Sequence, residues 1–100
     1  MESSNKILNI IGSIQRALLG KITPNLRAVY VLIGEDNALD LIFYYENNLS
    51  EIEEELSSLA DTEFIADFPS PYYKTSCDIQ VLPLSEKIPK KGRCIYKRYE

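Results

Sequence analysis

The sequence predicts a two-layer sandwich of the α+β class with the element order αββαββ. Two stretches place apolar residues at helical spacing, and four stretches have the alternation and residue types of strands. A single helical stretch separates the two pairs of strands, an arrangement typical of α+β folds. We therefore expect a four-stranded, mostly antiparallel sheet with two helices on one face.

The first helix is expected near the beginning of the chain. Ser3 or Ser4 is suited to the N-cap position, and Gly20 is a suitable C-terminal stop. Apolar residues follow the i, i+4, i+7, i+11 spacing that defines one buried face of a helix. The residues of this face are Ile7, Ile11, Ile14 and Leu18.

A β-hairpin is expected next. Residues 26–33 alternate two apolar faces and are rich in β-branched and aromatic types, so this strand should be buried on both sides. The polar tetrapeptide 34–37 has the length of a hairpin turn. In the second strand one face is apolar and the other is mixed. Leu39, Leu41, Phe43 and Tyr45 form the first face, and Asp40, Tyr44 and Glu46 the second.

The second helix begins with a capping box. Ser50 is followed three residues later by Glu53, which satisfies two N–H groups at a helix start. Pro69 and Pro71 end the helix. Its expected apolar face consists of Ile52, Leu56, Leu59, Ala60 and Phe64.

Two further strands are expected, at residues 74–82 and 93–99, joined by a polar and basic linker over residues 83–92. Each contains one cysteine, Cys77 and Cys94. Without a C-x-x-C spacing or any histidine, these predict reduced thiols in adjacent strands and no zinc site.

Size and composition argue against catalysis. One hundred residues, 45% of them hydrophobic, fit a single domain spanning residues 1–100. The absence of histidine removes Ser-His and Cys-His chemistry, and the four glycines form no phosphate loop. We expect a protein that is not an enzyme and has no cofactor. Polar residues interrupt the apolar N-terminal segment, so we expect no signal peptide or membrane span and a cytoplasmic location.

The charge distribution is the strongest functional signal. No lysine or arginine lies between Arg27 and Lys74, whereas both flanking segments are basic. A continuous acidic surface attracts basic proteins and repels nucleic acid. The segment contains eleven carboxylates, namely Glu35, Asp36, Asp40, Glu46, Glu51, Glu53, Glu54, Glu55, Asp61, Glu63 and Asp67.

The charged residues are also compatible with roles that need no basic protein partner. A charge run can be a solvated face, and the helix dipole favours acids in the first turn of the second helix. Paired carboxylates could serve a hydrolase or a divalent metal, although the spacing matches neither a glycosidase pair nor a calcium loop. The basic C-terminal block could contact nucleic acid, but lysine on an edge strand also protects against aggregation.

Four segments resemble small immunity proteins of bacterial contact-dependent growth inhibition systems, the CdiI type. They are ALLGKITPNLRAVYV (17–31), LIFYYENNLSEIEEE (41–55), TEFIADFP (62–69) and YKRYE (96–100). The resemblance implies a cytoplasmic antitoxin that blocks the C-terminal toxin domain of a cognate CdiA protein. Many such toxins are nucleases, often acting on transfer RNA.

Charge and resemblance together predict a toxin inhibitor that is monomeric or weakly dimeric when free and binds no nucleic acid or membrane directly. An acidic surface can occupy the basic site in which a nuclease holds phosphates. The alternative is a small acidic adaptor for another basic protein. The predicted toxin-binding residues are Glu35, Asp36, Asp40, Tyr44, Tyr45, Glu46, Glu51, Glu54, Glu55, Asp61 and Glu63.

Overall fold

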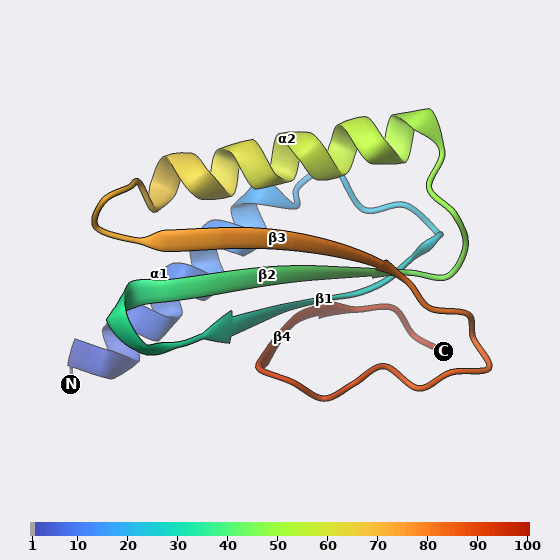
Figure 1. Ribbon diagram of the computed structural model, residues 1–100. Coiled ribbons are helices and arrows are strands. Elements are labelled where there is room, and N and C mark those ends of the chain that lie inside the picture. Colours follow the sequence, from blue (N-terminus) through green and yellow to red (C-terminus); the bar gives the residue numbers. More distant parts are fainter. Residues whose placement is uncertain (1) are drawn as a thin grey trace.

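The computed structural model describes the backbone of residues 2–100 and the side chains from residue 5 onward. Its element order is αββαββ, as predicted, with one short 3-10 turn in the hairpin (Figure 1). The elements are α1 (Glu2–Ala17), β1 (Leu26–Ile33), η1 (Glu35–Asn37), β2 (Ala38–Tyr45), α2 (Glu51–Asp67), β3 (Lys74–Val81) and β4 (Arg93–Lys97).

The four strands form one sheet in the order β3-β2-β1-β4. β1 pairs antiparallel with both β2 and β4, but β3 runs parallel to β2. The sheet is therefore mixed rather than mostly antiparallel. The physical reason is the connection through α2, which returns the chain to the end of the sheet where β2 began, so that β3 starts in the same direction.

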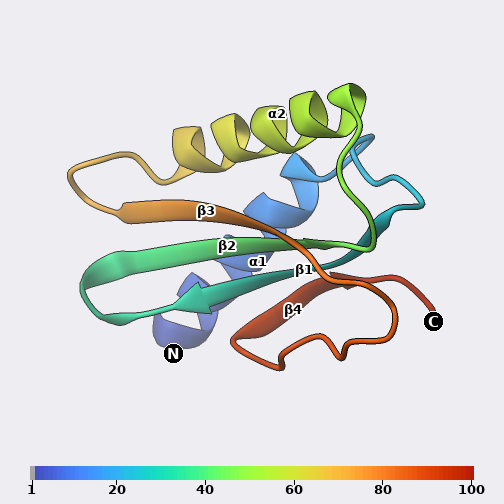
Figure 2. The same cartoon turned by 45° about the vertical axis from the view of Figure 1, so that its right-hand side comes forward.

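Both helices cover the same face of the sheet, as expected (Figures 1 and 2). Side chains from α1 and α2 share one core with alternate residues of the hairpin strands, whose β-branched and aromatic side chains fill the space between the layers. The centre of this core contains Ile10, Ile14, Val29, Val31, Leu41, Phe43, Ala60 and Phe64.

The apolar faces predicted for the helices are partly wrong. In α1, Ile10 is buried, whereas Ile7 and Ile11 are only half-buried. In α2, Ile52 and Leu59 are 67% and 48% exposed. The helix is instead rotated so that Glu53, Ser57, Ala60 and Phe64 face inward. This rotation lets the Glu53 carboxylate reach partners outside its own helix.

The second face of the hairpin is covered by the linker between β3 and β4. Leu82 and Ile88 pack against a small cluster that includes Tyr30 and Tyr44. The two tyrosine rings meet edge to face with their centroids 6.0 Å apart. β1 is therefore buried on both sides, as its sequence predicted.

Arg27, at the start of β1, fixes this linker. Its buried guanidinium donates two hydrogen bonds to the Glu100 carboxylate, at 2.8 and 2.9 Å. It also donates to the backbone carbonyls of Leu82, Pro83 and Glu86 at 2.8 to 3.0 Å. The hydrogen bonds from Arg27 lower the pKa of Glu100 from 4.5 to about 2. Such charge-assisted bonds are among the stronger ones in proteins.

The two cysteines are free thiols, but they do not lie in adjacent strands. Cys77 is in β3 and Cys94 in β4, at opposite edges of the sheet. The prediction of neighbouring strands was wrong because the linker carries β4 across to the far side of β1. Burial raises the pKa of the Cys77 thiol to about 12, so this thiol stays protonated at neutral pH.

The stability of the protein should fall on acidification between pH 4.5 and pH 2. Because the folded pKa of Glu100 is lowered, its contribution is complete above pH 4.5 and is lost as the pH falls through about 2. The measurement is urea denaturation at several pH values. Glu100→Gln should lower stability at pH 7 and flatten this part of the profile, whereas Glu55→Gln should leave the slope unchanged. Parallel profiles for wild type and Glu100→Gln would contradict the role of the ion pair.

Two glycines with left-handed backbone allow a test of steric packing. Gly20 and Gly92 have φ values of 75° and 80°. A Cβ on Gly20 would meet no atom within 4 Å, but a Cβ on Gly92 would lie 2.4 Å from the Val31 carbonyl oxygen. Gly20→Ala should cost about 1 kcal/mol of unfolding free energy. Gly92→Ala should cost about 2 kcal/mol more. Equal losses in chemical denaturation would exclude the close contact between β1 and the start of β4.

Candidate functional site

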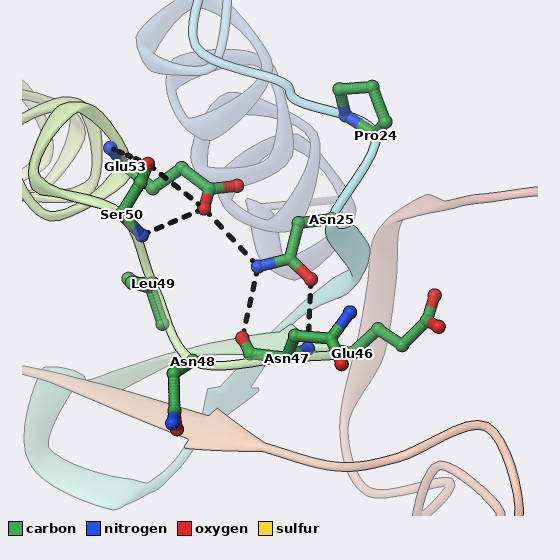
Figure 3. Close-up of a pocket in the computed structure, with 8 residues that line it drawn as sticks. All are labelled: Pro24, Asn25, Glu46, Asn47, Asn48, Leu49, Ser50 and Glu53. Atoms are coloured by element: carbon green, nitrogen blue, oxygen red, sulfur yellow. Dashed lines mark hydrogen bonds between the residues drawn. The ribbon is translucent and has the colours of Figure 1, made fainter.

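A polar hollow lies where α2 begins, between the loop before β1 and the loop after β2 (Figure 3). Asn25 connects the two loops. Its side-chain amide donates to the Asn47 carbonyl at 3.0 Å and to the Glu53 carboxylate at 3.3 Å, and its oxygen accepts from the Asn47 N–H at 2.8 Å. Ser50 and Glu53 form the predicted capping box.

Glu53 is a structural residue. Burial alone would raise the pKa of its carboxyl, but hydrogen bonds from Ser50, Thr23 and Asn25 more than compensate and lower it. The carboxylate is therefore charged and fully engaged. Since Asn25, Asn47, Ser50 and Glu53 already bond to one another, we assign these contacts to bracing α2 against the loops and not to ligand binding.

Unlike Glu53, three of the carboxylates on the exposed surface of α2 have no partners among the described residues. Glu51, Glu54 and Glu55 are exposed, and their carboxylates form no hydrogen bond or ion pair with residues 5–100. We call these three residues the acidic face. Glu51 and Glu54 lie in the first turn and interact favourably with the helix dipole, which explains why they are tolerated but leaves their charges available to a partner.

Several other predicted contact residues have partners inside the protein. Glu46 pairs with Arg98 at 2.9 Å, and Glu63 pairs with Lys21 at 3.1 Å. Asp40, on β2, accepts a hydrogen bond from Ser76 on β3. These carboxylates are partly neutralised or already engaged, so the continuous charge of the sequence becomes discontinuous on the surface.

Glu35 and Asp36 lie apart from the acidic face. They belong to η1 at one end of the hairpin, whereas α2 starts beyond the other end of β2. β2 has eight residues, so the two groups are separated by roughly 25 Å. The structure therefore does not gather all the predicted contact residues into one site.

Tyr44 and Tyr45, which are among the predicted toxin-binding residues, are not at the surface. They are 2% and 1% exposed, on opposite faces of β2. Burial raises the pKa of Tyr45 to about 12. The acids on either side suggested an exposed segment, but a strand in the middle of the sheet buries both of its faces.

Asp61 has the most unusual environment among the predicted residues. It lies on the side of α2 that faces β3, and its Oδ1 atom is buried without a hydrogen-bond partner among the described residues. Burial raises the pKa of its carboxyl. Glu54, Ser57, Ser58, Cys77 and Ile79 line the same shallow groove.

The described part of the chain offers neither a metal centre nor a helical membrane span. Among the side chains of residues 5–100 there is no group of three or more histidine, cysteine, aspartate or glutamate residues arranged to hold a metal ion. None of the helices in residues 2–100 is long and apolar enough to cross a membrane.

Comparison with known families gives the class of the protein. Residues 8–100 match the model of the MafI2 immunity protein. The chain belongs to the MafI2 immunity protein family. The match confirms the immunity-protein part of the resemblance seen in the sequence, but it gives the family as MafI2 and does not support the CdiI type. No curated protein matches the chain.

Membership in this family indicates which kind of partner the exposed carboxylates could bind. An immunity protein acts by binding a toxin protein, so the partner to consider for the acidic face is a protein. The match extends over both helices and all four strands except the first residues of α1. The brace around Glu53 and the acidic face of α2 both lie within it.

The Glu53 brace can be tested with a neighbour in the same helical turn. Glu53→Ala removes the capping box and the bonds to Thr23 and Asn25, and should cost about 2 kcal/mol of unfolding free energy. Glu51→Ala removes an exposed carboxylate and should cost less than about 1 kcal/mol. Thermal and urea denaturation measure both. Similar losses in the two variants would show that the brace contributes little.

Proposed function

We propose that this member of the MafI2 immunity family neutralises a cognate toxin domain by binding it one to one through the acidic face of α2. The main support is the exposure of three carboxylates that have no partner among residues 5–100. Charge complementarity accelerates encounter and selects a basic partner. A small acidic adaptor for another basic protein would use the same surface, but family membership favours a toxin.

The sign of the charge favours a partner with a basic surface. A nuclease must hold phosphates, so its active site is basic, and an acidic inhibitor can cover that site. We propose a nuclease toxin acting on RNA, with a CdiA-type C-terminal domain acting on transfer RNA as the specific hypothesis. Inhibition would combine electrostatic attraction with steric exclusion of the nucleic acid.

The size of the surface is sufficient for specific binding. Stable interfaces bury about 800 Å² on each partner. The chain has 6439 Å² of accessible surface, so an interface of that size would take about one eighth of it. The basic linker over residues 83–92 lies on the other face of the sheet and stays outside this interface.

The first experiment is coexpression with the toxin domain encoded beside the immunity gene. Cell survival together with copurification of a one-to-one complex is the expected result. Cell death without a complex would contradict the proposal and would favour the adaptor for another basic protein.

Charge reversal tests the acidic face directly. Glu51→Lys combined with Glu55→Lys should slow association with the toxin about tenfold at low salt, and the difference should shrink as salt screens the charges. The matched control, Glu35→Lys with Glu86→Lys, changes the net charge equally but at other positions. Stopped-flow measurements give the rates, and circular dichroism verifies that both variants fold. Equal slowing by both variants would show that net charge matters and the acidic face does not.

A further inference from the structure

The two edges of the sheet are not equivalent. β4 forms one edge with only five residues, a register shift opposite Val29 and Tyr30, and basic side chains at Arg93 and Lys97. Short length, irregularity and charge all discourage pairing with another strand. This edge is therefore protected.

β3 forms the other edge and lacks most of these protections. It has eight residues, contains no proline, and pairs with β2 in unbroken register from Lys74 to Val81. In Figures 1 and 2 no other strand lies beside its outer edge. No backbone hydrogen bond within residues 2–100 reaches that edge.

The pairing with β2 shows which amides of β3 point outward. The Leu82 N–H donates to the Tyr45 carbonyl of β2 at 2.7 Å. Since N–H and C=O groups alternate sides along a strand, even-numbered residues of β3 face β2 and odd-numbered residues face outward. The outward-facing amides are those of Thr75, Cys77, Ile79 and Val81.

A groove of about 260 Å³ runs between this strand and α2. Glu54 and Asp61 contribute carboxylates to it, and the buried Oδ1 of Asp61 has no hydrogen-bond partner among the described residues. A buried acceptor without a donor costs free energy, which a lysine or arginine from outside would recover. Ile79 and Val81, 41% and 43% exposed, add apolar surface along the strand.

We propose that the outer edge of β3 binds an extended segment of the toxin as a fifth strand, with a lysine or arginine of that segment reaching Asp61 and Glu54 in the groove. The inference rests on the proposed function and adds how the partner is held. Main-chain hydrogen bonds would supply affinity, and the acidic groove would supply selectivity for a basic side chain. The acidic face lies on the same helix, so a basic partner would contact both.

Charge argues against a second copy of this chain as the occupant. Pairing of two β3 edges would bring two acidic grooves, each with Glu54 and Asp61, next to each other. β3 has a single basic residue, Lys74 at its beginning, and no cation near Ile79 to enter the groove. A basic segment from another protein fits the site and a second copy does not.

Amide hydrogen exchange of the complex tests the proposal at single residues. In the free protein the amides of Thr75, Cys77, Ile79 and Val81 should exchange fast, whereas those of Ser76, Asp78 and Gln80 should be protected by β2. Toxin binding should slow the first group at least tenfold. A stable, protective complex in which these amides still exchange fast would overturn the fifth-strand inference and leave the proposed function intact. Failure to form any complex would overturn both.

Substitutions can distinguish the contribution of the β3 backbone N–H groups to toxin binding from the contribution of the acidic groove. Ile79→Pro removes an outward N–H without touching the pairing to β2, and its matched control Ile79→Ala removes the side chain but keeps the N–H. Toxin affinity should be at least tenfold weaker for Ile79→Pro than for Ile79→Ala. Asp61→Asn should weaken binding about tenfold and reduce its salt dependence. The inference would be overturned if Ile79→Pro bound the toxin as tightly as Ile79→Ala and Asp61→Asn bound it as tightly as the wild type. It would also be overturned if the free protein dimerised with rising concentration and this protected the outward-facing amides of β3.

Discussion

The central constraint on this structure is that the β1–β2 hairpin is apolar on both faces. Val29 and Phe43 point to one side, and Tyr30 and Tyr44 to the other. A strand pair of this kind cannot leave either face in water, so the rest of the chain has to form two covers. The helices provide the first, and the linker held by Arg27 provides the second. The peripheral strands are much less buried, which leaves them available for other roles.

Much of the fold could be predicted because its signals are local. The capping box joins residues three apart, and the hairpin depends on a four-residue turn between two alternating segments. The direction of β3, the far position of β4 and the rotation of α2 depend instead on distant contacts. Glu53 binds Asn25 and Thr23, which lie 28 and 30 residues away. The hydrophobic pattern of α2 alone therefore placed Ile52 and Leu59 inward, while the brace turned them toward solvent.

In the candidate site, too, the local features could be predicted and the features that depend on distant contacts could not. The sequence revealed a segment without bases, but it did not show which acids are neutralised across the fold. The partner of Glu46 is Arg98, 52 residues further along the chain. Tyr44 and Tyr45 stand beside acids in the sequence, and yet both are buried in a central strand of the sheet. The open edge of β3 had no signal in the sequence, because the strand order that exposes it was not readable from the pattern. Asp61 appeared as one acid among eleven until its burial next to β3 distinguished it.

Arg27 has one more consequence, which concerns chain entropy. It binds carbonyls at residues 82, 83 and 86 and also the Glu100 carboxylate, so one guanidinium holds both ends of the segment that contains β4. A tether at both ends keeps a segment at high effective concentration beside its docking site. A strand of five residues pairs weakly by itself, but this one has little freedom to move away from β1. A non-covalent clasp can thus hold a short strand in place where a longer ladder of hydrogen bonds would otherwise be needed.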